Sequence, residues 1–129
     1  MCILIDIGVD IIEIERIRNT INRYPSFMDK VFCQNEVEYF KERNMNISVI
    51  AATFAAKEAV SKVLGTGIGA VGWKDIEIVR DDTGRPGVIL HGQALLVSQD
   101  KHIKYISVSL SHSRRYAVAN AVGVREGIK

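Results

Sequence analysis

The apolar residues of this chain recur with two different periods, and the dominant period changes near the middle of the sequence. In the first half, Ile14, Ile17 and Ile21 recur at the spacing of a helix. Beyond the glycine-rich residues 65–72, apolar and polar residues alternate, which is typical of strands with one exposed face. The pattern therefore predicts a mostly helical first half and a mostly β second half.

Capping residues, glycines and prolines predict where each element begins and ends. We expect helices over residues 12–23, 35–44, 48–64 and 93–99. We expect a buried strand over residues 2–9 and further strands over 75–80, 104–110 and 116–124, with a hairpin partner that contains Val88 and Leu90. The expected helix caps are Ser48, the pair Asn35 and Glu38, and, at a C-terminus, Gly65. The expected fold is a single α+β domain over residues 1–129, with helices packed on a mainly antiparallel sheet.

Composition narrows the class of protein. The 129 residues, 47% of them hydrophobic and 25% charged, are ordinary for a soluble globular protein. Cys2 and Cys33 lack C-x-x-C spacing and are typical of reduced thiols in a cytoplasmic protein. No basic segment precedes Asp6, and no apolar run approaches the ~20 residues of a membrane span. With a net charge of only +2, we expect neither a nucleic acid nor a membrane as partner.

Residues 54–62 (FAAKEAVSK) carry the candidate chemistry. On a helix, Phe54, Glu58 and Lys62 fall on one line, so a carboxylate lies one turn from an ammonium group beside an aromatic ring. These charges border the apolar stripe instead of opposing it, which favours a cleft. Asp10, at the end of the first strand, is a candidate second carboxylate. Two carboxylates and a lysine predict a site for a divalent cation and a phosphate.

Each of these residues also has a plain structural interpretation. Asp10 and Glu13 have capping-box spacing, so Asp10 is equally suited to cap the first helix. Glu58 and Lys62 have the spacing of a surface ion pair that is worth only ~0.2–0.5 kcal/mol. His112 lies in a turn between strands, where solvent exposure is ordinary.

The glycines of residues 67–72 (GIGAVG) match the dinucleotide-binding pattern G-x-G-x-x-G letter for letter. That motif follows a strand and opens a helix, so that a pyrophosphate meets the helix N-terminus. Here a helix is expected before the glycines and a strand after them. We therefore interpret the segment as a helix end and a turn whose bare backbone permits close approach of a ligand.

Taken together, these motifs resemble a known family. Gly8-Val9-Asp10, the run FAAKEAVSK, Gly65-Thr66-Gly67 and residues 109–113 (SLSHS) are similar, in order and spacing, to holo-[acyl-carrier-protein] synthases. These are the short group of the 4′-phosphopantetheinyl transferase superfamily, and the resemblance covers essentially the whole chain. It implies the fold of that superfamily and transfer of phosphopantetheine from coenzyme A to a serine of apo acyl carrier protein, with release of adenosine 3′,5′-bisphosphate. It also implies Mg²⁺ as cofactor and a homotrimer with active sites between subunits.

The resemblance also implies a role for each matching residue. Asp10 and Glu58 match the magnesium ligands, and Lys62 matches the lysine beside the coenzyme pyrophosphate. The positions along the coenzyme are Gly65, Thr66, Gly67, Pro86, His112 and Ser113. The positions on the carrier-protein surface are Arg16, Arg23, Phe27 and Lys30. Thr53 departs from the family, which often has arginine there, and the effect of this departure on coenzyme binding stays open at the level of sequence.

Two further points stay open at the level of sequence. The base that deprotonates the carrier serine is unassigned; Glu58, acting through a bound water, is the first candidate and Glu36 the second. A relative that binds coenzyme A or a carrier without transfer is the alternative function, and a generic interaction protein that uses its arginine-bearing helix is another. Dependence on divalent metal and on coenzyme A separates the three.

Overall fold

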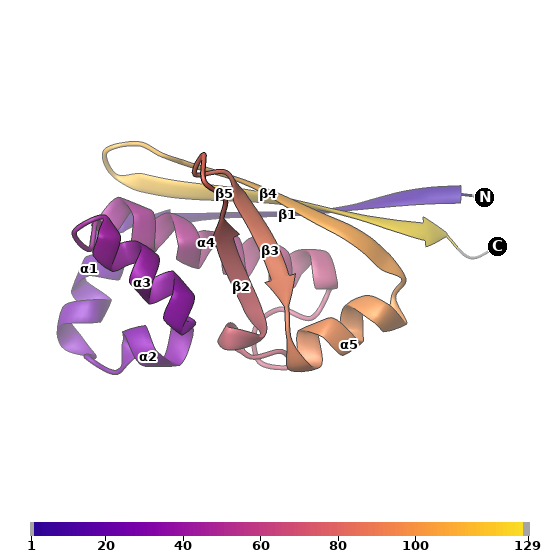
Figure 1. The fold of residues 1–129 in the computed structure, drawn as a ribbon, viewed down its shortest axis with the longest axis horizontal. Helices are drawn as coiled ribbons and strands as arrows, with labels where there is room; N and C mark the ends of the chain where they lie inside the picture. The colour runs from indigo at the N-terminus through magenta and orange to yellow at the C-terminus, as the bar shows by residue number, and fades with distance from the viewer. Residues whose placement is uncertain (1, 128–129) are drawn as a thin grey trace.

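The computed structural model describes residues 2–127 and has the α+β fold expected from the sequence (Figure 1). Its elements, in chain order, are β1 (Cys2–Glu13), α1 (Ile14–Arg23), α2 (Phe27–Val31), α3 (Gln34–Glu42), α4 (Ile47–Leu64), the 3₁₀ helix η1 (Trp73–Asp75), β2 (Ile76–Arg80), β3 (Pro86–Leu90), α5 (Gly92–Asp100), β4 (Ile103–His112) and β5 (Tyr116–Gly127). The strands form a three-stranded antiparallel sheet of order β1-β5-β4 and a separate β2-β3 hairpin. The prediction of a mainly antiparallel sheet is confirmed.

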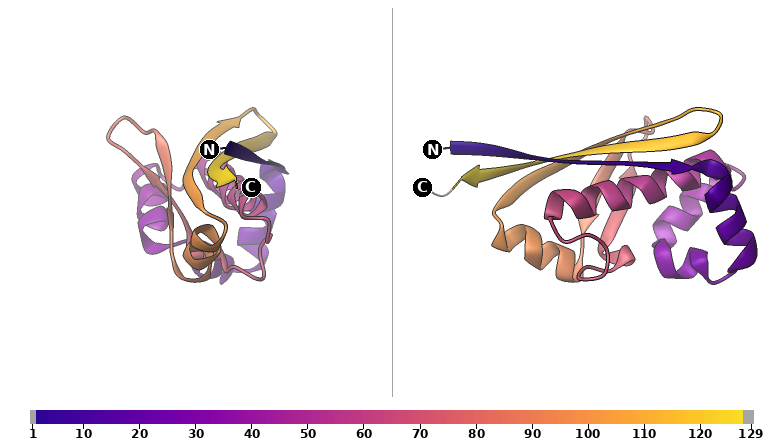
Figure 2. Two further views of the ribbon diagram at one scale, coloured as in Figure 1. Left: turned by 90° about the vertical axis from the view of Figure 1, so that its right-hand side faces the viewer. Right: turned by 180° about the vertical axis from the view of Figure 1, so that it is seen from behind.

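Helix α4 is the centre of the packing. Small residues of α4 lie against the alanines of the central strand β5. All of these residues are buried: Ala55, Ala56 and Ala59 on α4, and Ala117, Ala119 and Ala121 on β5. Small side chains on both surfaces let the helix approach the sheet closely. All helices lie on the same side of the three-stranded sheet, as two perpendicular views show (Figures 1 and 2).

Strand β1 differs from its prediction in length and burial. It continues to Glu13 because its backbone pairs with β5 along the whole length, including Ile12 with Ala117. Its outward residues from Ile3 to Ile11 are exposed instead of buried, because all helices of the described residues pack on the other face of the sheet (Figures 1 and 2). Helix α1 consequently begins at Ile14, two residues later than predicted.

This boundary decides the interpretation of Asp10. Asp10 lies inside β1, and the residue that precedes α1 is Glu13, whose side chain makes no capping hydrogen bond. The interpretation of Asp10 as a helix cap is therefore wrong. Its carboxylate is free for another partner.

The other two predicted N-terminal caps are each displaced by two residues, whereas the predicted C-terminal cap Gly65 is confirmed. Asn46, not Ser48, caps α4, since its Oδ1 accepts hydrogen bonds from the backbone N–H groups of Ser48 and Val49. Helix α3 begins at Gln34, and its reciprocal cap joins Cys33 N–H to Glu36 instead of joining Asn35 to Glu38. Helix α2 was not predicted, because five residues are too few to show a period.

Candidate active site

The approach of β1 to α4 depends on Gly8. A Cβ atom at this position would collide with the carbonyl oxygen of Ala59. Because side chains alternate along a strand, Asp10 points to the same face of β1 as Gly8. The missing side chain at Gly8 thus lets β1 lie directly on α4, and the next inward residue, Asp10, arrives beside the last turns of that helix.

The resulting contact joins Asp10 to Lys62. The Lys62 ammonium lies 3.4 Å from Asp10 Oδ1 and donates a 2.7 Å hydrogen bond to the carbonyl oxygen of Val9. Among residues 2–127, no ion pair joins Lys62 to Glu58. The alternative of a simple surface pair within the helix is therefore wrong, and Lys62 is directed to the strand that carries Asp10.

The carboxylates of Asp10 and Glu58 are close enough for the charge of Asp10 to affect the pKa of Glu58. Partial burial raises the pKa of Asp10, and Lys62 opposes this shift. Partial burial also raises the pKa of Glu58, and the nearby charge of Asp10 adds to the rise. The Lys62 charge lowers both pKa values in part, although among the described residues its ammonium group forms an ion pair only with Asp10. The described residues offer no cluster of three metal-ligating side chains, but two carboxylates are sufficient for Mg²⁺ when substrate phosphate and water complete its coordination.

A cavity of about 330 Å³ opens beside these carboxylates. Asp10 and Glu58 line it together with Phe54 from the same face of α4, Arg16 from α1 and Phe27 from α2. Two predicted carrier-surface residues, Arg16 and Phe27, are thus brought to the carboxylates. The other two are exposed and lie farther out, Arg23 at the end of α1 and Lys30 in α2.

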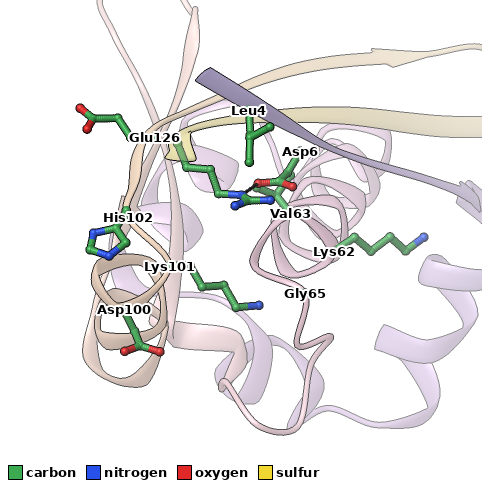
Figure 3. Close-up of a pocket in the computed structure, with 10 residues that line it drawn as sticks. Leu4, Asp6, Lys62, Val63, Gly65, Asp100, Lys101, His102 and Glu126 are labelled. Atoms are coloured by element: carbon green, nitrogen blue, oxygen red, sulfur yellow. Dashed lines mark hydrogen bonds and ion pairs between the residues drawn. The ribbon is translucent and has the colours of Figure 1, made fainter. Parts of the chain in front are cut away.

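The turn after α4 lies at the Lys62 end of the helix, as the sequence predicts. Gly65 has a φ of 78°, the left-handed conformation that ends helices, and Thr66 Oγ1 donates a 2.9 Å hydrogen bond to Gly67 O. Lys101 donates a hydrogen bond to the carbonyl oxygen of Leu64, so an ammonium group that sequence reasoning missed caps this terminus. A cavity of about 500 Å³ adjoins the turn, and Lys62 extends away from Lys101 at its edge (Figure 3).

The remaining predicted coenzyme residues lie elsewhere in the chain. Pro86 and His112 line a third cavity of about 210 Å³, in which α4 contributes Val49 and Ala52. At about 100° per residue, Val49 and Ala52 point to the flank of α4 opposite Glu58. Ser113 follows His112 in the β4-β5 turn, where its Oγ accepts a 3.3 Å hydrogen bond from the backbone of Tyr116. One chain therefore does not bring these residues to Asp10 and Glu58.

Arg80 is the charged group of this third cavity, and sequence reasoning did not single it out. It follows Ile76 and Ile78 on the same face of β2, and both isoleucines are buried. The sequence signal that could have identified Arg80 is its position, since it alternates with two core isoleucines on one face of a strand. Burial lowers the pKa of its guanidinium group, which nevertheless stays charged.

Glu36 is not a suitable base. Its side chain is buried, and its two oxygens accept hydrogen bonds from the backbone of Cys33 (2.7 Å) and Ile78 (2.8 Å). Its Oε1 also lies 2.8 Å from the Lys57 ammonium. With both oxygens engaged inside the core, Glu36 has no path to a substrate proton, so the second candidate for the base is wrong.

Comparison with known proteins identifies the class. Residues 6–121 match the model of the 4′-phosphopantetheinyl transferase superfamily. The chain belongs to this superfamily, as its motifs indicate. A holo-[acyl-carrier-protein] synthase of Clostridium perfringens is 49% identical over 123 residues, which cover 92% of this chain and 92% of that protein. A protein of the same name from Alkaliphilus oremlandii is 48% identical over 118 residues, covering 92% of this chain and 97% of that protein.

Solved structures agree with this assignment. A holo-(acyl-carrier-protein) synthase from Bacillus anthracis in complex with CoA (3′,5′-ADP) has a TM-score of 0.78 and 36% identity, covering 97% of this chain and 100% of that chain. The Helicobacter pylori holo-[acyl-carrier-protein] synthase in complex with coenzyme A has a TM-score of 0.81 and 32% identity, covering 91% of this chain and 98% of that chain. Within residues 2–127, no helix is both long and apolar enough to span a bilayer.

Proposed function

We propose that this chain is a holo-[acyl-carrier-protein] synthase, which transfers 4′-phosphopantetheine from coenzyme A to a serine of apo acyl carrier protein. The observation that carries the proposal is that Asp10 lines one cavity with Glu58 and forms an ion pair with Lys62, although it lies about fifty residues from both in the sequence. The family motifs assign all three residues to the metal and coenzyme site. The names of the relatives and the coenzyme complexes of the structural neighbours support the same reaction.

Asp10 and Glu58 are the residues that would hold Mg²⁺. Burial raises the pKa of both carboxylates, and the charge of Asp10 adds to the rise at Glu58, so a divalent cation would stabilise their ionised forms. When bound, the metal supplies Lewis-acid stabilisation of charge on the phosphate oxygens. Lys62 has half of its side chain exposed and so keeps ammonium protons free for a phosphate oxygen.

The chemistry is one in-line displacement. The carrier serine Oγ attacks the β-phosphorus of coenzyme A, the bond from that phosphorus to the bridging oxygen breaks, and adenosine 3′,5′-bisphosphate leaves. Lys62 stabilises the charge that develops on the phosphoryl oxygens. Glu58, whose pKa is raised by burial and by Asp10, is the candidate that accepts the serine proton, directly or through water.

The α1-α2 surface is the proposed docking site for the carrier. Its basic residues Arg16, Arg23 and Lys30 suit an acidic partner, and Arg16 and Phe27 line the cavity that contains the two carboxylates. A carrier held here would present its serine to that cavity.

We propose further that the enzyme is a homotrimer. Every second residue along the outward face of β1 is apolar and more than half exposed. The exposed fractions are 61% for Ile3, 62% for Ile5, 68% for Ile7, 55% for Val9 and 64% for Ile11. The same sheet face continues into Val118, Val122 and Val124 on β5 and Tyr105 on β4, and no helix of residues 2–127 covers it (Figure 2). An apolar surface of this extent is typical of a protein interface. Further copies of this chain are the proposed cover.

An active site shared between two chains would explain why the predicted coenzyme residues lie on opposite flanks of α4. Pro86 and His112 lie on the flank away from Asp10 and Glu58, although the family motifs give all four to one coenzyme site. Two neighbouring chains would each supply one flank.

Cytoplasmic location stays a prediction, which the two free cysteines support.

Mass spectrometry of an apo carrier incubated with the protein, coenzyme A and Mg²⁺ tests the reaction. We expect one added phosphopantetheine, no addition when the metal is chelated, and none with Glu58→Gln, whereas Glu42→Gln, an exposed glutamate of α3, should act normally. An unmodified carrier, with folded protein and several carriers tried, contradicts the proposal.

Subunit mixing tests the shared site. Glu58→Ala and His112→Ala chains, each inactive alone, should regain activity when mixed and allowed to exchange, because some interfaces then combine two intact flanks. A stable, fully active monomer in light scattering would contradict both the trimer and the shared site.

A further inference from the structure

Arg80 is held in a defined position at the third cavity. Its Nη2 donates a 3.2 Å hydrogen bond to Thr53 Oγ1, and its guanidinium carbon lies 4.7 Å from the centre of the Tyr39 ring. Thr53 in turn donates a 2.9 Å hydrogen bond to Val49 O, so its hydroxyl is fixed on α4. The guanidinium group is thus pre-positioned on an aromatic ring and a buried hydroxyl.

The surroundings of Arg80 lack a compensating charge. Among the described residues no carboxylate oxygen lies within 4.0 Å of Arg80, and no acidic residue lines the cavity. The nearest acidic influence is Glu36, whose oxygens already serve Lys57 and two backbone N–H groups. A second guanidinium group, that of Arg43, lies 3.7 Å from the centre of the same Tyr39 ring. The cavity is therefore a positive site, in which the guanidinium group of Arg80 is engaged by the Thr53 hydroxyl but by no carboxylate of residues 2–127.

We infer that Arg80 binds the 3′-phosphate of coenzyme A and takes the place of the arginine that this chain lacks at position 53. The guanidinium group reaches the hydroxyl of Thr53 itself, so another element, β2, places a cation beside position 53. This inference rests on the proposed function, since it assumes coenzyme A as the ligand.

The chemistry of the ligand separates this site from the metal site. Coenzyme A carries a pyrophosphate, which Lys62 and the metal would neutralise, and a remote phosphate monoester on the ribose. A monoester is dianionic near neutral pH and offers several oxygens, which the planar fork of arginine binds in pairs. Pro86 and His112 line the same cavity as Arg80 and were expected along the coenzyme.

Calorimetric titration with two nucleotides tests the inference. Adenosine 3′,5′-bisphosphate carries the 3′-phosphate, and adenosine 5′-monophosphate lacks it. We expect wild-type protein to prefer the bisphosphate, and Arg80→Gln to weaken its binding about ten- to hundredfold while leaving the monophosphate within roughly twofold. Lys74→Gln removes the same charge from an exposed residue outside the cavity and should change neither affinity.

Three results would overturn the inference: equal losses for both nucleotides with Arg80→Gln, no loss for either, or a wild-type protein without preference. If Arg80→Gln does not fold, Arg80→Met keeps the aliphatic stem over Tyr39 and should show the same selective loss. The carrier assay is independent of these titrations. A protein that binds the bisphosphate through Arg80 but modifies no carrier would contradict the proposed function and leave the phosphate site standing.

Discussion

Two lysines of α4, five residues apart, show how differently one motif uses the same side chain. Lys57 is fully buried, lies 2.8 Å from Glu36 Oε1 and donates to the carbonyl oxygens of Trp73 (2.9 Å) and Ile76 (2.5 Å). Lys62 is half exposed, lies 3.4 Å from Asp10 Oδ1 and donates to one carbonyl oxygen, that of Val9. Lys57 thus has an acceptor for each of its three ammonium protons, whereas Lys62 has only two acceptors among the described residues, Asp10 and Val9.

Burial explains the difference in role. A charge in the core is tolerated only when every proton finds an acceptor, so Lys57 is committed to joining α4 to α3, η1 and β2. A half-exposed pair such as Lys62 and Asp10 contributes about 0–1 kcal/mol to folding and can exchange its partner for a ligand. The tightly satisfied lysine builds the fold, and the loosely held lysine is available for chemistry.

Removing the buried lysine should have the largest effect. We expect Lys57→Ala to lower the free energy of unfolding by about 3–5 kcal/mol, because Glu36 is left as an uncompensated buried charge. Urea denaturation followed by circular dichroism measures this loss. The double variant Lys57→Met with Glu36→Gln removes both charges and should recover much of the stability. A Lys57→Ala variant as stable as wild type would break the comparison.

Removing the exposed lysine should spare the fold and damage the reaction. We expect Lys62→Ala to unfold within about 1 kcal/mol of wild type and to lose about 10²-fold or more in kcat, since stabilisation of the phosphoryl oxygens is lost. Denaturation and carrier modification on the same preparation measure both. Lys74→Ala is the control, and normal turnover by Lys62→Ala would refute its role.

The carrier surface should respond more weakly and only to one substrate. We expect Arg16→Glu to raise the KM for the carrier about tenfold at low salt, with a smaller effect at high salt, because exposed charges are screened. The KM for coenzyme A should stay unchanged. Arg18→Glu, on the opposite side of α1 and already paired with Glu15, is the matched control. Equal losses for both substrates would mean that Arg16 supports the fold.

The smallest effect concerns Glu58 and stability. Its pKa is raised in the folded state, so the unfolded state binds fewer protons between the two values, and the free energy of unfolding falls as pH rises through that window. Without metal, Glu58→Gln should therefore be at least as stable as wild type near neutral pH, by less than about 1 kcal/mol because solvent screens the site. Thermal unfolding measures this. Added Mg²⁺ should stabilise wild type alone, and equal stabilisation of both would contradict the assigned ligand.

Two predicted helices show how much of the fold could be predicted from the sequence. The helix predicted over 48–64 is α4, and its end at Gly65 is confirmed, because period and glycine act locally. The helix predicted from residue 12 failed at its start. The letters at 10–13 (DIIE) suit a helix cap as well as a strand, and pairing with β5 along β1 decided between them.

The sequence alone determined that Glu58 and Lys62 lie on one line of a helix, since residues four apart are neighbours in any α-helix. Only tertiary structure decided that Gly8 brings Asp10 to that line, that Lys57 meets Glu36 in the core, and that Arg80 reaches Thr53. These contacts join segments 21 to more than 50 residues apart. Spacing fixes what a side chain meets within a turn, whereas the packing of whole elements fixes what it meets beyond it.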